Sequence, residues 1–83
     1  MAAPQRMFYS AIWMIQLLHK KIVPKNVGQT YKKHVRVALK QFKKYTQYAP
    51  SNFEHLYYLL KAEYSRYVGK ISSAKLYYDR AIQ

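Results

Sequence analysis

The chain has 83 residues, enough for one small domain with a modest core. It contains no cysteine, which excludes a disulfide framework and a thiolate metal site, and 51% of its residues are apolar, which excludes an intrinsically disordered chain. The formal net charge is +12. Charge repulsion of this size favours an anionic surface nearby, such as nucleic acid, anionic lipid or an acidic part of a protein.

The positive charge is concentrated in the first 53 residues, which contain no Asp or Glu. Ten basic residues lie there: Arg6, Lys20, Lys21, Lys25, Lys32, Lys33, Arg36, Lys40, Lys43 and Lys44. Residues 54–83 hold five basic residues and all three acidic ones. The N-terminal part therefore carries the candidate anion-binding residues.

Residues 7–18 are almost continuously apolar and predict a buried helix. One helical face collects Phe8, Ala11, Ile12, Ile15, Leu18 and Ile22, and Trp13, Met14 and Leu17 broaden it. A membrane-spanning helix is the alternative, although it needs about 20 apolar residues. A secretory signal is also possible, but His19, Lys20 and Lys21 follow where a cleavage site would stand. Pro24 and Gly28 are then expected to break the chain.

A second helix is predicted from about Gln29 to Tyr48. Apolar residues recur along it at alternating gaps of four and three, at Tyr31, Val35, Ala38, Phe42, Tyr45 and Ala49. Basic residues occupy the other faces: Lys32, Lys33, Arg36, Lys40, Lys43 and Lys44. They form either a solvated face or an anion-binding face, and Pro50 is expected to end the helix.

Two shorter helices follow. The third is predicted from Ser51 to Val68, because Ser51 and Glu54 have the spacing of a capping box, and Gly69 suits the left-handed residue after a helix. The fourth is predicted from Ile71 to Ile82, with Ser72 and Ser73 as candidate caps.

The last two helices are expected to fold back on each other about Gly69. Small residues allow a close approach and tyrosines fill the remaining space; the hairpin-packing residues are Tyr58, Ala62, Gly69, Ala74, Tyr78 and Ala81. This spacing is typical of a tetratricopeptide-type repeat. The predicted fold is all-α, with about four helices forming two antiparallel hairpins in one unit, 1–83: a basic hairpin at 1–49 and a tetratricopeptide-like hairpin at 50–83.

Residues 52–82 also resemble a segment of large multidomain sensor kinases of bacteria and fungi. The similarity rests on Asn52, Phe53, His55, Tyr57 or Tyr58, Leu60, Ala62, Glu63, Arg66, Gly69, Ala74 and the run from Tyr77 to Ile82. Weaker similarity extends upstream, at 8–11 and 40–45. Proteins of this family join a serine/threonine-kinase-like region, a nucleotide-binding ATPase core, tetratricopeptide-like helices, a GAF sensor and a histidine kinase.

The resemblance implies a non-catalytic helical linker or scaffold in a signalling protein. Other helical repeats or kinase domains of the parent type would be its protein partners. Residues 1–83 contain none of the family's kinase, ATPase, sensor or phosphoacceptor domains, and their charge is higher than is usual for the family segment. Both departures fit a stand-alone remnant, a truncated gene, or a descendant with a new basic partner.

The glycines, acidic residues and histidines of the chain do not form a catalytic, cofactor-binding or metal-binding pattern. Gly28 and Gly69 are too far apart for a phosphate-binding loop, and three acidic residues give no convincing carboxylate pair. His19, His34 and His55 lack the spacing of a helical metal site. His55 is expected to pack or to hydrogen-bond near a helix start rather than to accept a phosphate. The sequence therefore predicts that the protein is not an enzyme.

The leading hypothesis is therefore a cytoplasmic interaction module that docks on other helices. The alternative is a small basic subunit of a ribonucleoprotein or organellar complex, holding RNA phosphates by charge. Membrane attachment through residues 7–18 is a weaker third possibility.

Overall fold

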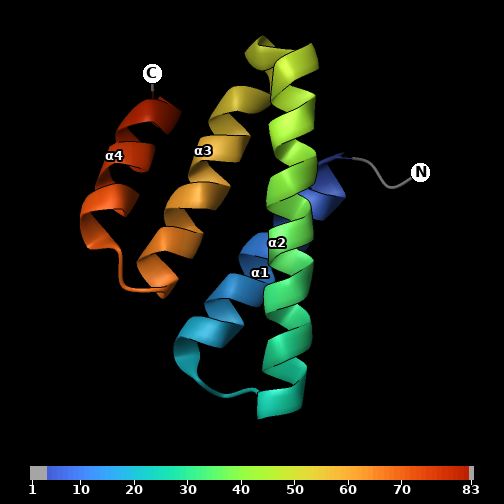
Figure 1. The fold of residues 1–83 in the computed structure, drawn as a ribbon, viewed down its shortest axis with the longest axis vertical. Helices are drawn as coiled ribbons and strands as arrows, with labels where there is room; N and C mark the ends of the chain where they lie inside the picture. Colours follow the sequence, from blue (N-terminus) through green and yellow to red (C-terminus); the bar gives the residue numbers. More distant parts are fainter. Residues whose placement is uncertain (1–3, 83) are drawn as a thin grey trace.

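The computed structural model describes residues 4–82. These residues form four helices, α1 (Pro4–Lys20), α2 (Lys25–Tyr48), α3 (Pro50–Tyr67) and α4 (Ile71–Ile82), with no strand among them. Consecutive helices run in opposite directions along the molecule (Figure 1). The prediction of an all-α fold with four helices is confirmed.

The four helices form a flat assembly with principal extents of 37 × 34 × 15 Å. Helices α2, α3 and α4 lie side by side, and α1 crosses behind α2 in the same view (Figure 1). Helix α3 packs against the other three helices, whereas α4 packs against α3 within the described part of the chain. Helix α4 therefore has more uncovered surface than a helix in the middle of the assembly.

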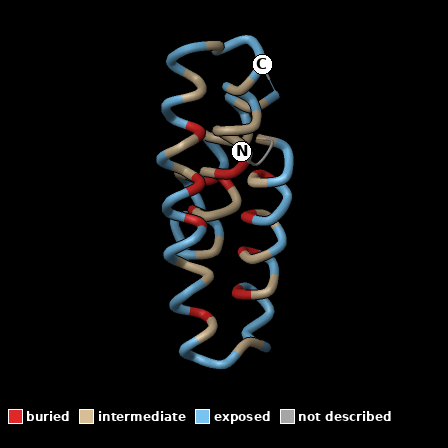
Figure 2. Tube along the Cα trace, turned by 90° about the vertical axis from the view of Figure 1, so that its right-hand side faces the viewer, coloured by how far each residue is buried: buried red, intermediate tan, exposed pale blue. Residues whose placement is uncertain are grey.

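The hydrophobic core lies where α1, α2 and α3 meet. Its buried members are Phe8, Ala11, Ile15, Val35, Ala38, Phe42 and Leu60. Buried positions follow the sides of the helices that face one another (Figure 2). The ring of Phe42 is fully buried and makes edge contacts with the rings of Phe8 and Phe53, at centroid distances of 6.1 and 6.4 Å. Burial of one such side chain contributes about 2–3 kcal/mol, which makes Phe42 a principal contributor to stability.

The apolar seam predicted on the second helix is confirmed, since Val35, Ala38 and Phe42 are buried. The broad apolar face predicted for the first helix is narrower than expected. Trp13 is 64% exposed because it lies on the side of α1 opposite to Ala11 and Ile15. Ile22 is 67% exposed because α1 already ends at Lys20. No helix within residues 4–82 combines the length and apolarity needed to cross a membrane.

The expected break at Gly28 is wrong, because α2 begins at Lys25 and contains Gly28 in its first turn. Pro24 is the N-cap residue, with φ −58°, and its carbonyl accepts a hydrogen bond from the amide of Gly28 at 2.8 Å. Gly28 is buried, and a Cβ there would lie 3.4 Å from Cδ2 of Leu18. A small residue at this position therefore lets the end of α1 pack close to the start of α2.

The joint between α2 and α3 is a single residue, Ala49, which is both the C-cap of α2 and the N-cap of α3. Pro50 occupies the first turn of α3, where its fixed φ is suited to the helix and its missing N–H is no loss. The predicted capping box is wrong, since Ser51 already lies inside the helix and α3 has no side-chain cap.

Helix α3 ends at Tyr67, with Val68 as its C-cap, and Gly69 is the left-handed residue predicted after it, with φ +89°. The amides of Gly69 and Lys70 donate to the carbonyls of Arg66 and Ser65, at 3.2 and 2.8 Å, which is the hydrogen-bond pattern of a Schellman motif. Ser72 and Ser73 are not N-caps, because α4 begins at Ile71 and both serines lie inside it. Glycine thus allows the sharp reversal that brings α4 back against α3.

Candidate functional site

Helices α3 and α4 pack against each other, and each of them carries a buried alanine. Ala62 is fully buried and Ala74 is 3% exposed, while Ala81 is half-buried near the end of α4. Each of these side chains is a single methyl group, so the two backbones can approach closely. Gly69 joins the two helices with no atom within 4 Å of the position that a Cβ would take.

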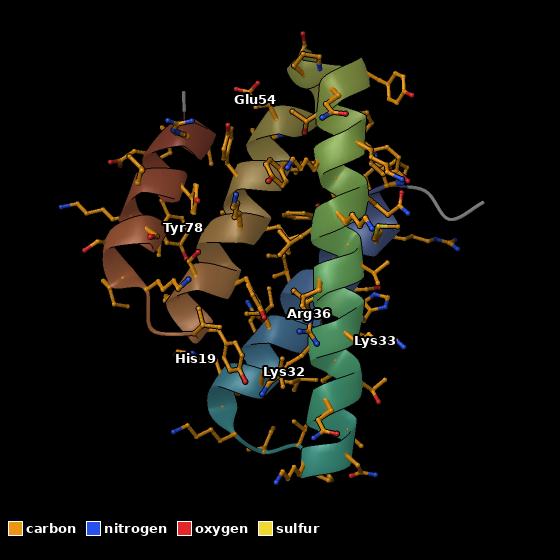
Figure 3. All side chains as sticks on the ribbon, in the orientation of Figure 1. His19, Lys32, Lys33, Arg36, Glu54 and Tyr78 are labelled. Atoms are coloured by element: carbon orange, nitrogen blue, oxygen red, sulfur yellow. The ribbon has the colours of Figure 1, made fainter. Side chains whose placement is uncertain are left out.

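The tyrosines of the hairpin contact different partners from those expected. Tyr58 on α3 stacks on Tyr77 of α4, with ring centroids 6.1 Å apart and an angle of 18° between the rings. Tyr78, which is labelled in Figure 3, instead donates a hydrogen bond from its hydroxyl to Glu63 of α3 at 2.5 Å. The tyrosines therefore occupy separate parts of the α3–α4 contact.

A groove runs along α3 between α2 and α4, and we call it the α2–α4 groove. Its floor is formed by residues of α3: Tyr57, Tyr58, Lys61, Tyr64 and Ser65. Its walls are formed by Leu39, Lys43, Thr46 and Gln47 of α2 and by Ser73, Leu76, Tyr77 and Arg80 of α4. Two hollows that share Lys61 and Tyr77 make up the groove, so it is elongated along α3. Helix α1 contributes no lining residue.

Lys61 lies at the centre of the α2–α4 groove and is surrounded by tyrosines. Its Nζ donates a hydrogen bond to the hydroxyl of Tyr57 at 3.3 Å and lies 4.8 Å from the ring centroid of Tyr77. Burial lowers the pKa of Lys61, but its interactions with Tyr57 and Tyr77 outweigh burial and raise that pKa above the ordinary value. Lys61 therefore carries a positive charge at neutral pH.

Arg80 forms a second positioned cation at the same groove. Its guanidinium lies over the ring of Tyr58, 5.6 Å from the centroid, and its Nη1 donates to the Tyr58 hydroxyl at 3.4 Å. No Lys or Arg nitrogen lies within 4.0 Å of a carboxylate oxygen in residues 4–82. Both Lys61 and Arg80 are thus held by aromatic rings and hydroxyls rather than by ion pairs.

The two ends of the α2–α4 groove differ in charge. Lys70 lines the end near the α3–α4 turn. At the other end, Glu54 and Asp79 lie with Arg80 around an adjoining hollow. An anion would therefore bind more favourably at the centre of the groove than beyond Arg80.

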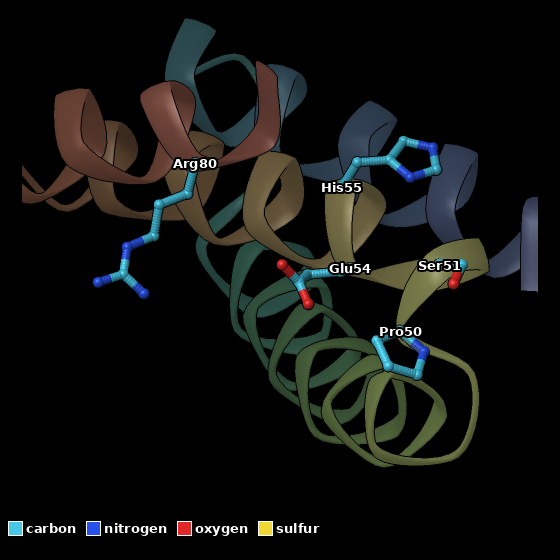
Figure 4. Close-up of a pocket in the computed structure, with 5 residues that line it drawn as sticks. All are labelled: Pro50, Ser51, Glu54, His55 and Arg80. Atoms are coloured by element: carbon cyan, nitrogen blue, oxygen red, sulfur yellow. The ribbon is translucent and has the colours of Figure 1, made fainter. Parts of the chain in front are cut away.

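A third, polar hollow lies beside the first turn of α3. It is lined by Pro50, Ser51, Glu54, His55 and Arg80 (Figure 4). The side chains of His55 and Arg80 point away from each other, on either side of Glu54 (Figure 4). This arrangement has no convergent nucleophile, acid and base.

The six basic residues of α2, for which the sequence left a solvated face and an anion-binding face open, share one side of the helix. They are Lys32, Lys33, Arg36, Lys40, Lys43 and Lys44, which we call the basic stripe. At 100° per residue they span a sector of about 120°. Five of them are exposed, and Lys32 is half-buried with its Nζ 6.0 Å from the ring centroid of Tyr67. Figure 3 shows the side chains of Lys32, Lys33 and Arg36 pointing away from α2 in different directions.

The basic stripe adjoins other cationic side chains at both ends. Lys43 belongs both to the stripe and to the wall of the α2–α4 groove. At the start of α2, Lys21, Lys25 and Lys32 border a shallow hollow beside Gly28. Positive charge thus extends along most of α2, from its first turn to the groove.

The histidines do not contribute a site in the described part of the chain. His19, His34 and His55 are all exposed. His55 makes no hydrogen bond there, so its expected packing or hydrogen-bonding role is wrong. No group of three His, Cys, Asp or Glu residues between 4 and 82 is arranged to hold a metal ion.

The sequence reasoning did not single out Lys61, Tyr57, Tyr77 or Arg80 as site residues. The four-residue spacing of Tyr57 and Lys61 on one helix was available as a signal. The contacts of Tyr77 and Arg80 depend on how α4 packs on α3, and no local pattern indicates them.

Comparisons with protein-family models, with curated proteins and with solved structures found no match to this chain.

Proposed function

We propose that this protein is a non-catalytic interaction module of tetratricopeptide-like helical hairpins, acting as a cytoplasmic scaffold in signal transduction. The proposal takes as its model the helical array of multidomain sensor kinases, which residues 52–82 resemble. The protein's partners are other helical repeats or kinase domains of that type. The close packing of α3 and α4 through Ala62 and Ala74 supports the hairpin arrangement.

The observation that carries this proposal is the exposure of apolar side chains on α4. Ile71 and Ile82 are 63% and 84% exposed and point in about the same direction, although they lie at opposite ends of the helix, about 16 Å apart along its axis. Helical repeats bury such surfaces by stacking on a neighbouring helix. A partner helix packed on α4 would cover them.

Crosslinking in cells tests the proposal. The tagged chain is crosslinked and purified under denaturing conditions, with and without nuclease treatment. A protein partner that survives nuclease is expected, and the paired change Ile71→Ser and Ile82→Ser should abolish its capture. Val37→Ser is the control, because Val37 is also exposed but lies on α2. Crosslinks to nucleic acid alone would contradict the proposal.

A second candidate function is electrostatic binding of RNA phosphates by a basic subunit of a ribonucleoprotein or organellar complex. The basic stripe favours it, because five of its six cations are exposed along one side of α2. Binding of a labelled RNA should then weaken steeply between low and physiological salt, and changing Lys33, Arg36 and Lys40 to Gln should reduce the salt slope. Absence of binding at low salt would remove this candidate.

A further inference from the structure

We propose that the α2–α4 groove binds an acidic segment of a partner protein, with a carboxylate held between Lys61 and Arg80. This inference rests on the proposed interaction function and specifies the chemistry of one partner. The exposed surface of α4 at Ile71 and Ile82 is a separate feature, so the two can be tested independently.

The first argument is that both cations are already positioned. Lys61 contacts the hydroxyl of Tyr57 and the ring of Tyr77, and Arg80, which is exposed, contacts the hydroxyl and ring of Tyr58. Tyr58 and Tyr77 are themselves stacked, so the two cation-holding groups support each other. A carboxylate that binds here meets cations whose side-chain freedom is already restricted, which lowers the entropic cost of binding.

The second argument is that neither cation forms an ion pair within the described residues, although Glu54 and Asp79 lie beyond Arg80. Between residues 4 and 82, neither Lys61 nor Arg80 has a carboxylate within ion-pair distance. Lys43 adds a third positive charge on the opposite wall of the groove. A carboxylate from outside therefore meets net positive charge at the centre of the groove.

The groove also discriminates between an acidic peptide and a nucleic acid. The rings of Tyr58 and Tyr77 are stacked on each other, and Lys61 lies over the rings of Tyr57 and Tyr77, so a base that stacked here would compete with these contacts. Glu54 and Asp79 at one end would repel a nucleic acid, which carries a phosphate at every nucleotide. A segment with acidic residues among apolar ones avoids this repulsion.

The shape of the groove sets the size of the segment. Its lining residues on α3 run from Tyr57 to Ser65, which is about 12 Å of helix. An extended peptide covers that length with about four residues. Leu39 on one wall and Leu76 on the other supply apolar contacts beside the cations.

The test measures binding of a fluorescein-labelled peptide of alternating Glu and Leu, about ten residues long so that it exceeds the groove. Fluorescence anisotropy is recorded at physiological salt, with a second peptide in which Gln replaces every Glu. The groove variant carries Lys61→Gln and Arg80→Gln. The matched control carries Lys33→Gln and Lys44→Gln, which removes the same charge from the basic stripe outside the groove.

The Glu peptide should bind the unmodified protein and the Gln peptide should not. The groove variant should weaken binding about tenfold or more, and the matched control by less than about threefold, because exposed charges at a distance act weakly. Leu76→Glu provides a second groove variant. Leu76 is 53% exposed, so the fold tolerates this change. The new carboxylate lies on the wall of the α2–α4 groove, where it would repel the Glu peptide.

Equal weakening by the groove variant and the matched control would overturn the inference, since binding would then follow net charge. Equal binding of the Gln peptide, or failure of the Glu peptide to bind, would also overturn it. If oligouridylate displaced the peptide, and if the groove variant weakened oligouridylate binding as much as peptide binding, the groove would be assigned to nucleic acid instead. None of these results alters the expected capture of a partner on α4, so the two proposals fail separately.

Discussion

The hydroxyl of Tyr78 on α4 donates a 2.5 Å hydrogen bond to Oε1 of Glu63 on α3. Burial, the hydrogen bond and the negative charge of Glu63 all favour the neutral phenol and raise the pKa of Tyr78 to about 12, although Arg66 opposes the shift. The pKa of an unfolded tyrosine is about 10. The stability that this contact provides is therefore fully present below about pH 10 and is lost as the pH rises from about 10 through 12.

Tyr78→Phe should lower the free energy of unfolding by about 1 kcal/mol at pH 7, because the hydrogen bond to a carboxylate is lost. The variant should also lose less stability than the unmodified protein between about pH 10 and 12. Urea denaturation at a series of pH values measures both effects. Tyr48→Phe is the control, since Tyr48 is 89% exposed. An equal decline at high pH in the unmodified protein and the Tyr78→Phe variant would contradict the assignment.

Ala62→Leu tests the close approach of α3 and α4. Ala62 is fully buried at this contact, so a larger side chain must push the helices apart. The expected loss is about 1–3 kcal/mol, measured as a lower melting temperature by circular dichroism. Gln16→Leu, at an exposed position of α1, should change the melting temperature little. An unchanged melting curve for Ala62→Leu would show that the two helices are not packed through this alanine.

Lys21→Gly tests backbone strain at the end of α1. Lys21 has φ +59°, a left-handed conformation that costs a residue with a Cβ about 1 kcal/mol. Glycine removes that cost, so the variant should gain about 0.5–1 kcal/mol of stability in urea denaturation. Lys21→Ala removes the charge but keeps the strain, and it should bring no such gain. The opposite kind of substitution at the other left-handed position, Gly69→Ala, should lower the free energy of unfolding by about 1 kcal/mol from backbone strain alone.

The parts of the fold that the sequence predicted are those set by local periodicity and by glycine. The seam of Val35, Ala38 and Phe42 repeats with the helical period, and a residue with positive φ was needed where Gly69 stands. Both features are local, so they could be identified without knowing the neighbours. The same holds for Ala62 and Ala74, whose small size marks a close contact.

The errors arise where a residue has two local roles or where the contact is non-local. Gly28 was interpreted as a break between helices. A glycine inside a helix can instead make room for a neighbouring side chain, here that of Leu18. The partner of Tyr78 could not be deduced, because Glu63 lies 15 residues away and meets it only after α4 has folded back. The α2–α4 groove has the same origin: Tyr58 and Arg80 are 22 residues apart.

The joint at Pro50 provides the last test, because two start signals for α3 compete there. The spacing of Ser51 and Glu54 predicts a capping box, whereas the structure begins α3 at Pro50 with no side-chain cap. Ser51→Ala should therefore leave the free energy of unfolding within about 0.5 kcal/mol of the unmodified protein, since alanine also suits a helix interior. Pro50→Ala should lose about 0.5–1 kcal/mol, because proline restricts the unfolded chain at a φ that the helix start accepts. Urea denaturation of the two variants separates the signals: a loss of 1 kcal/mol or more at Ser51 with none at Pro50 would restore the capping box.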